Sequence, residues 1–414
     1  MAGPGSYLVG QEEADEVMDV LSGRYLLRYG DSANLAFKHK VWSLERAFEE
    51  KFDVPHALAL NSGSSALFAG LASLGIGPGD EVIAPGYCYI SSLSSIIHAG
   101  AVPVLAEIDD TLTLDPDDVI RRITPRTRAI MPVHMLGAPS RMDVLSDIAQ
   151  RYGLAIIEDA CQACGGSFRG RRLGTIGDLG AFSLNSDKII TAGDGGVLIT
   201  PDSGLYTRAF AFHDQGFIPS EKAISTEESE LLGLTLRMNE ITGAVALAQL
   251  RKLDRILYTM RENRAKLAAA LPSLPGMSVK PSTDPAGDCG SILTLQFDTP
   301  KRAARVADAL GTMTLEKTGW HVYSNMRPLL ARGPRALVEC PSNCGIHPTE
   351  VRFDRVKLPR TDLALQRSVN LSIGVVDPFV GAAFGLNILS DDEEIEHVAR
   401  DFDLRVRAEL KGRH

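Results

Sequence analysis

Short apolar runs alternate with longer amphipathic stretches from about residue 56 to residue 212 of this 414-residue chain. Such alternation is typical of a parallel sheet covered by helices. The runs with strand character are HALAL (56–60), EVIAP (81–85), VPVLAEI (102–108), RAIMPVH (128–134), LAIIEDA (154–160), GAFSL (180–184) and GVLIT (196–200). The stretches with helical spacing between them are 64–74, 90–99, 115–122 and 141–152. The pattern predicts an α/β fold with a mostly parallel seven-stranded sheet between helices.

Apolar spacing outside this region predicts a second, smaller unit. The remaining elements are helices over 41–52, 239–270, 301–310 and 391–409 and a strand over 291–297. Residues 320–350 read as a long loop. A chain of this length exceeds the usual size of one hydrophobic core. We therefore expect a large domain over residues 1–255 and a smaller C-terminal α+β domain over residues 256–414.

Composition and charge narrow the class of partner. The formal charge of −9 and the pI near 5.6 come without a basic stripe, so neither nucleic acid nor an anionic membrane surface is expected to bind. No segment has the 18 or more apolar residues of a membrane span, and the first residues do not resemble a secretion signal. These features favour a cytoplasmic protein with a small-molecule partner.

Six cysteines in 414 residues are too few to indicate a disulfide framework. Cys161 and Cys164 form a CxxC pair, and Cys340 with Cys344 a looser one, so a four-thiolate zinc site is conceivable. Cys161 directly follows a predicted strand, however, and the second pair is far away in the sequence. We favour ordinary thiols and expect no metal.

The stretch GDLGAFSLNSDKIITAGDGGVLIT (177–200) carries the clearest chemical signal. A strand leads to Ser183 and, after a short polar turn, to Lys188 ahead of a glycine-rich loop. A lysine at a strand end can lose water, lower its pKa and form a Schiff base with an aldehyde. The alternative is a solvated surface lysine, which is the more common case for a lysine taken alone.

LAIIEDACQACGG (154–166) places Asp159 at the end of an apolar strand. A buried carboxylate there needs a cationic partner, and a protonated pyridine nitrogen is one such partner. That pairing would turn a pyridoxal ring into an electron sink. Alternatively, Glu158 or Asp159 caps the next turn.

LNSGSSALFAGL (60–71) joins a strand to a helix through Gly63 and Ser64. Backbone N–H groups at such a helix start bind phosphate, and the hydroxyl of Ser183 could add a donor. Ser64 could instead be an ordinary N-cap. In APGYCYISS (84–92), Tyr87 or Tyr89 could lie on a planar cofactor, or either could be a core residue.

Taken in order, GSSAL, GDEVIAPGYCY, PVHMLG, IIEDACQACGG, FSLNSDK with GDGG, and LRMNEITGAVALAQLRKLD resemble the sugar aminotransferase family called DegT/DnrJ/EryC1/StrS. The resemblance is strong over roughly residues 10–260 and looser beyond. It implies the fold of type I aspartate aminotransferases, pyridoxal 5'-phosphate (PLP) as cofactor, and a homodimer with active sites at the subunit interface.

The resemblance also implies roles for single residues. Lys188 matches the Schiff-base lysine, Asp159 the partner of the pyridine nitrogen, Gln162 a residue near the ring and Tyr89 the aromatic that stacks on the cofactor. Gly63, Ser64 and Ser183 match the phosphate cradle. The loop after Lys188 has Asp194 where the family usually has Glu.

Three further features concern the acceptor and the neighbouring subunit, and two of them depart from the commonest family pattern. Arg237 matches an element that reaches the neighbouring subunit's site, and it is an expected substrate contact. Thr235, an expected cofactor contact, stands where the family usually has Asn. The segment GWHVYSNMRPLL (319–330) is unlike the commonest members and resembles those acting on unusual sugars, with His321 and Tyr323 as expected substrate contacts.

The resemblance implies transfer of an amino group from glutamate or glutamine to a keto sugar or keto-cyclitol, either free or carried on a nucleotide or phosphate. A PLP-dependent lyase, dehydrating or aromatising, is the alternative. The dehydratases of the family replace the lysine by histidine, which disfavours that branch because Lys188 is present. A non-catalytic PLP-binding regulator is a further alternative, but the chain has no room for a DNA-binding helix-turn-helix before residue 40.

Overall fold

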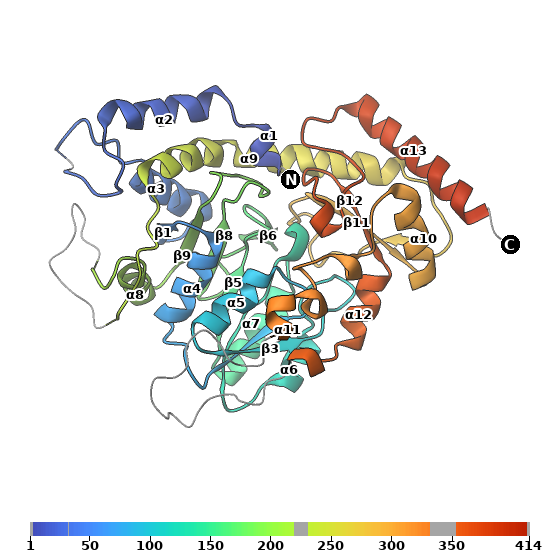
Figure 1. The fold of residues 1–414 in the computed structure, drawn as a ribbon, viewed down its shortest axis with the longest axis horizontal. Helices are drawn as coiled ribbons and strands as arrows, with labels where there is room; N and C mark the ends of the chain where they lie inside the picture. The colour runs from blue at the N-terminus through green and yellow to red at the C-terminus, as the bar shows by residue number, and fades with distance from the viewer. Residues whose placement is uncertain (1–2, 32, 219–230, 332–352, 412–414) are drawn as a thin grey trace.

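The computed structural model describes residues 3–31, 33–218, 231–331 and 353–411 (Figure 1). Its main sheet has the strand order β1-β9-β8-β5-β4-β2-β3. The strands are β1 (His56–Leu60), β2 (Glu81–Pro85), β3 (Val102–Ala106), β4 (Thr127–Ile130), β5 (Ala155–Asp159), β8 (Leu179–Ser183) and β9 (Gly196–Thr200). In this sheet only β9 runs against its neighbours, β1 and β8. Every predicted run overlaps one of these strands, so the mostly parallel sheet is confirmed.

Helices cover both faces of this sheet (Figure 1). They are α3 (Lys40–Phe52), α4 (Gly63–Ser73), α5 (Ile90–His98), α6 (Pro116–Arg122), α7 (Met142–Tyr152), α8 (Ser203–His213) and α9 (Glu240–Ala270). Successive residues of β1 point to opposite faces. Ala57 and Ala59 join the core under α3, α7 and α9, whereas Leu58 and Leu60 join the core under α4, α5 and α8. The predicted helices are confirmed, while α8, α1 (Pro4–Tyr7) and α2 (Gln11–Gly23) were not anticipated.

The C-terminal part is built on a smaller antiparallel sheet. Its strands are β10 (Met277–Val279), β11 (Ile292–Phe297) and β12 (Ser368–Ser372), and its helices include α10 (Pro300–Leu310), α12 (Pro359–Gln366) and α13 (Asp392–Lys411). Helix α9 packs on α3 at one end and on α13 at the other (Figure 1). The boundary predicted near residue 255 lies inside α9, so this helix belongs to both parts.

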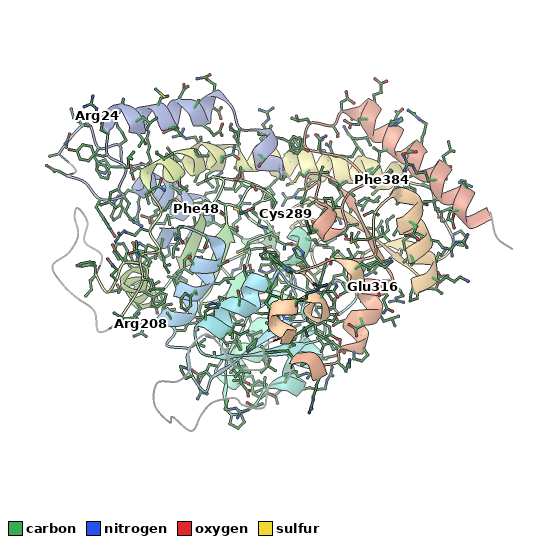
Figure 2. All side chains as sticks on the ribbon, viewed as in Figure 1. Arg24, Phe48, Arg208, Cys289, Glu316 and Phe384 are labelled. Atoms are coloured by element: carbon green, nitrogen blue, oxygen red, sulfur yellow. The ribbon has the colours of Figure 1, made fainter. Side chains whose placement is uncertain are left out.

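Side chains fill the space between the sheet and its helices (Figure 2). Phe48 of α3 stacks on Phe52 and lies 5.8 Å, between ring centroids, from Phe182 of β8. Phe182 precedes Ser183, so the packing of these three rings fixes the position of the carboxyl end of β8. Within the described ranges, no helix has the length and apolar character needed to cross a membrane.

A fully buried ion pair anchors the edge strand β1. Arg28 Nη2 binds Glu45 Oε1 at 2.9 Å. Glu45 Oε1 also accepts the N–H of Ala59, and Arg28 Nη1 donates to the carbonyl of Ala59. Neither side chain reaches solvent. Because Ala59 precedes the turn at Gly63, the pair fixes the position of that turn.

The first part of the predicted loop 320–350 is tied to the chain that follows β2. Residues 320–323 form three backbone hydrogen bonds with residues 86–90, of which Cys88 N–H to His321 C=O is 3.0 Å. This pairing places His321 beside Tyr89. The loop prediction is wrong for the next residues, which form a 3-10 turn (Tyr323–Asn325) and helix α11 (Arg327–Ala331). The predicted loop from residue 332 on lies outside the described residues.

Candidate active site

Four strand ends meet at one edge of the main sheet. Strands β1, β2, β5 and β8 all run in the same direction, so their carboxyl ends share an edge. Ligands of open α/β sheets bind outside such an edge. The residues that follow or end these strands are Gly63, Tyr89, Asp159 and Ser183, with Lys188 five residues further on. The fold therefore gathers the predicted cofactor residues in one place.

Lys188 is largely buried, with 14% of its side chain exposed. Its Nζ binds Asp187 at 3.0 Å and lies 5.8 Å from the centre of the Tyr89 ring. Gln162 and His321 line the same small cavity as Lys188. The amine thus faces an aromatic ring inside a cavity, which excludes the solvated surface alternative.

The cavity is also lined by the C-terminal part of the chain. Ser291, Ile292, Val375 and Val380 face it from β11 and from the segment after β12. The site therefore lies between the two parts of the molecule. Sequence reasoning missed Ser291 because nothing in SILTLQF marks it as different from a buried strand residue.

Asp159 is buried, with 4% of the residue exposed. Its Oδ2 accepts a hydrogen bond from Ser92 Oγ at 2.6 Å, and its Oδ1 accepts one from the N–H of Cys161 at 3.1 Å. Among the described side chains it has no ion-pair partner. A cation placed against this carboxylate would remove the cost of burying an unpaired charge.

Glu158, the neighbour of Asp159 on β5, serves the structure instead. Its carboxylate binds His134 Nε2 at 2.9 Å and accepts the backbone N–H groups of Gly174, Ile176 and Gly177. Adjacent strand residues point to opposite faces. The two carboxylates therefore point to opposite faces of the strand. Asp159 caps the turn that follows β5 through the N–H of Cys161, whereas Glu158 binds a more distant turn.

The turn from β1 to α4 is built on close backbone approach. A Cβ on Gly63 would lie 2.8 Å from Ser183 Cβ and 3.0 Å from Cys161 Sγ, so only glycine fits. The Ser64 hydroxyl donates to Ser91 Oγ at 2.9 Å. This contact joins the N-termini of α4 and α5, where free backbone N–H groups suit a phosphate. The N-cap of α4 is Ser62, so the capping alternative for Ser64 was wrong.

Gln162, which lines the cavity, and Tyr89, which lies beside His321 and Lys188, are both held in place. Gln162 Oε1 accepts the N–H of Leu136 at 3.0 Å. Tyr89 precedes α5, and its ring lies 5.1 Å from the ring of His321. Tyr87, the other aromatic considered, is fully buried in the core. The structure thus favours Tyr89 as the ring that faces a cofactor.

His321 is a buried histidine whose Nδ1 has no hydrogen-bond partner among the residues that the structure describes. Burial, together with the positive charge of Lys188, lowers its pKa to about 4. The imidazole is therefore neutral at ordinary pH. A neutral ring with an unused nitrogen is able to bind a hydroxyl or carbonyl group of a ligand.

Three predicted site residues do not turn toward Lys188. The hydroxyl of Tyr323 donates to Asp362 and accepts from the N–H of Leu358. Arg237 binds Asp214 of its own chain. Thr235 is exposed.

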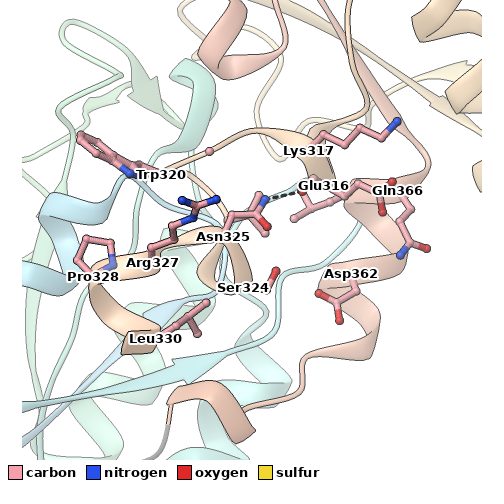
Figure 3. A pocket seen from close by; sticks show the side chains of 13 residues that line it. Glu316, Lys317, Trp320, Ser324, Asn325, Arg327, Pro328, Leu330, Asp362 and Gln366 are labelled. Atoms are coloured by element: carbon pink, nitrogen blue, oxygen red, sulfur yellow. Dashed lines mark hydrogen bonds between the residues drawn. The ribbon is translucent and has the colours of Figure 1, made fainter. Parts of the chain in front are cut away.

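A larger pocket of about 1230 Å³ opens beside the segment that carries His321 (Figure 3). Trp320, which is 55% exposed, lines it together with Arg327, Lys317 and Asp362. Asn325 donates to the carbonyl of Glu316 across its wall. The pocket offers an aromatic face, cations and hydrogen-bonding groups next to the small cavity.

The cysteines of the first pair take different surroundings. Cys161 lies next to Asp159, with its thiol near the carbonyl of Ala181, and Cys164 is buried in the core. Both are free thiols. Cys340 and Cys344 lie outside the described residues.

Comparison with known proteins identifies the family. A sequence model of the DegT/DnrJ/EryC1/StrS aminotransferase family matches residues 10–330. The chain belongs to this family. GDP-perosamine synthase of Caulobacter vibrioides is 42% identical over 51% of this chain and 57% of its own length. L-glutamine:2-deoxy-scyllo-inosose aminotransferase of Streptomyces kanamyceticus is 38% identical over 64% of each chain. The chain thus spans about three fifths of these two relatives.

The fold of the family extends over the whole chain. The crystal structure of 3-amino-5-hydroxybenzoic acid synthase superposes with a TM-score of 0.78 at 26% identity and covers 98% of both chains. PLP is the cofactor of this aminotransferase family. The residues present fit it: Asp159 has no cationic partner among the described side chains, Gly63 leaves the space that a Cβ would fill, and Lys188 faces the Tyr89 ring.

The close approach at Gly63 generates a first prediction. Gly63→Ala should weaken PLP binding by on the order of tenfold or more, because the new methyl group must displace Ser183 or Cys161. Gly70→Ala, in the same helix, meets its nearest atom at an ordinary 3.4 Å and should leave binding unchanged. Titration of the cofactor-free protein with PLP measures both. Equal affinities for the two variants would contradict the cradle.

The environment of His321 generates a second prediction. The unfolded chain protonates this ring near pH 6.5, whereas the folded chain resists protonation down to about pH 4. Stability is therefore lost as the pH falls below 6.5. Between pH 7 and pH 5 the wild type should lose about 2 kcal/mol more unfolding free energy than His321→Gln. Denaturant titrations at both pH values measure this, and parallel losses would show that the ring is solvated.

Proposed function

We propose that this protein is a PLP-dependent aminotransferase that moves an amino group from glutamate or glutamine to a keto sugar or keto-cyclitol. The observation that carries the proposal is Lys188, buried beside Tyr89 with the unpaired carboxylate of Asp159 at the same sheet edge. The names of the two relatives, a perosamine synthase and a scyllo-inosose aminotransferase, support this class of acceptor.

Each residue of the site has a chemical task in this reaction. Bound PLP supplies an aldehyde that condenses with amines and a ring that withdraws electrons from the neighbouring carbon. Asp159 holds the ring nitrogen protonated, and the N-termini of α4 and α5 with Ser183 hold the phosphate. Tyr89 packs on the ring face. Lys188 Nζ, when free, removes the proton from the donor carbon and later delivers one to the acceptor carbon.

The acceptor would enter from the side of His321. Its neutral ring binds a hydroxyl or carbonyl group close to the reacting carbon, and the apolar side chains Val375 and Val380 limit access of water. The larger pocket beside Trp320 has room for the rest of the acceptor. Arg327 and Lys317 line this pocket together with Glu316 and Asp362, so its formal charges balance. The cations could bind a phosphate of the acceptor, and the carboxylates could bind its hydroxyl groups.

A second candidate function is a PLP-dependent lyase. The likeness to 3-amino-5-hydroxybenzoic acid synthase, whose named product is an aromatic amino acid, supports an aromatising reaction on a cyclic ketone. The two functions differ in their need for an amino donor. An aminotransferase consumes glutamate or glutamine once per product, whereas a lyase does not.

We also propose that two copies of the chain form a dimer across the surface that carries Thr235 and Arg237. Tyr29 and Arg237 both bind Asp214, so residues 26–29 and 234–237 lie side by side. The leucines exposed on these two stretches and close to them in the sequence are Leu26, Leu27, Leu35, Leu232 and Leu234. A cluster of exposed leucines is typical of an interface. Arg237 then lies at the boundary with the second copy.

Replacement of the proposed anchor is the direct test of the function. Lys188→Ala should abolish turnover and remove the visible absorbance band of the wild type, while PLP still binds without a covalent link. Glutamate or glutamine should bleach the wild-type band. Full activity of the variant would overturn the assignment. A band that neither amino acid changes, in a protein that still converts a cyclic ketone, would favour the lyase.

Subunit mixing tests the shared site. Lys188→Ala and Arg237→Met should each be inactive alone if Arg237 acts in the site of the second copy. Mixed and re-equilibrated, they should regain activity, because one site of each hybrid has both residues intact. If the mixture stays inactive although hybrids form, Arg237 acts within its own subunit.

A further inference from the structure

The residues that carry this inference lie at the beginning of the described chain. Residues 3–7, which include the short helix α1, cross the hairpin loop between β8 and β9 that bears Lys188 (residues 184–195). Gly3 N–H donates to the carbonyl of Ser186 at 3.0 Å. Ser6 Oγ donates to the same carbonyl at 2.5 Å. Two hydrogen bonds thus hold the turn just before Lys188.

The contact between these residues and the hairpin is backbone against backbone. A Cβ on Gly3 would lie 2.3 Å from the carbonyl carbon of Asp187 and 2.5 Å from the carbonyl oxygen of Lys188. The φ of Gly3 is −85°, which any residue adopts. Lack of space alone therefore requires glycine at this position. A side chain on residue 3 would collide with the backbone of Asp187 and Lys188.

A second glycine, Gly5, makes a similar close contact with the backbone further along the hairpin. A Cβ on Gly5 would lie 2.8 Å from the backbone nitrogen of Thr191 and 2.7 Å from Gln249 Oε1. Gln249 of α9 is buried, accepts from Thr191 N–H and donates to Glu13 at 2.8 Å. The hairpin is thus enclosed between residues 3–7 and α9.

The opposite side of residues 3–7 meets the C-terminal part. A Cβ on Gly374 would lie 3.0 Å from Pro4 Cγ. The segment that begins there also supplies Val375 and Val380 to the cavity of Lys188. Residues 3–7 are therefore wedged between the lysine hairpin, α9 and the wall of the cavity, although the family match begins only at residue 10.

We propose that residues 3–7 position Lys188 for proton transfer, with Gly3 and Gly5 as positioning residues. The inference rests on the proposed role of Lys188 as cofactor anchor. A backbone shift at Gly3 is transmitted directly to Asp187 and Lys188, because they are in van der Waals contact. An amine that must reach two carbon atoms in turn tolerates little displacement, since misplacement by about 1 Å can cost on the order of 100-fold in rate.

The test compares Gly3→Ala with Gly10→Ala. Gly10 lies seven residues further along, also outside the left-handed region, and a Cβ there meets nothing within 4 Å. In the PLP-loaded protein, Gly3→Ala should lower kcat by about 10- to 100-fold with a smaller change in KM, and should shift the pH at which the visible band changes. Gly10→Ala should match the wild type in all three.

Hydrogen exchange provides a readout that needs no activity. In the protein as purified, Gly3→Ala should speed amide exchange in a peptide covering residues 184–195, and Gly10→Ala should not. Ser6→Ala, which removes one hydrogen bond and no space, should give a milder form of the same effects, and Ser6→Thr should reverse them. This pair decides the outcome if Gly3→Ala does not fold.

Two results would overturn the inference. One is a Gly3→Ala or Ser6→Ala protein whose band, kcat and hairpin exchange are those of the wild type. The other is equal effects from Gly3→Ala and Gly10→Ala, which would indicate a general loss of stability. If the wild type itself shows no visible band, the proposed function fails, and the exchange measurement still decides whether residues 3–7 restrain the hairpin.

Discussion

The carboxylate of Asp159 is buried at the end of β5 and has no ion-pair partner among the side chains that the structure describes. Its hydrogen bonds with Ser92 and Cys161 reduce the cost of this burial but supply no positive charge. In the proposed function, a protonated pyridine nitrogen of PLP would supply that charge. The same interaction would then both hold the cofactor ring and set its electron-withdrawing power, so the neighbouring groups would have to be placed relative to it.

Strand geometry does most of this placing. Because β1, β2, β5 and β8 run in parallel, their ends bring a glycine turn, an aromatic ring, a carboxylate and a hydroxyl to one edge without long loops. The reversed strand β9 then returns the chain after Lys188 into the sheet, so both ends of the lysine hairpin are fixed. The C-terminal part adds the remaining wall.

The sequence predicted the strands well because each is a short, buried apolar run between turns, as in HALAL and EVIAP. Helix α8 was not predicted because its last five residues, AFAFH (209–213), are all buried. They therefore show no division into an apolar and a polar side. Residues 320–323 were predicted as loop. Their backbone pairs with residues 86–90, and such a distant pairing leaves no periodic pattern in the local sequence. Lys188, Asp159 and Gly63 were predicted as site residues from their motifs and from the order of these motifs along the chain, and the structure places them at one edge of the sheet.

Sequence patterns could not predict contacts that form only when distant parts of the chain come together in the fold. Asp187 and Ser92 were not anticipated, although each stands next to a motif that was. Tyr323 binds Asp362 and Arg237 binds Asp214, contacts between residues 39 and 23 positions apart. The glycines at positions 3 and 5 carry no periodic signal either, since what they require is space against a distant backbone.

Helix α9 has 31 residues and is therefore about 46 Å long. Gln249 in its first half touches the lysine hairpin, and Asn263 in its second half donates to Ser390 of the C-terminal part. A continuous helix that spans both parts resists bending. In the proposed function, a closing movement of the C-terminal part over a bound acceptor would therefore have to bend α9 or rotate about it, while Gln249 holds the lysine hairpin at the other half of the helix.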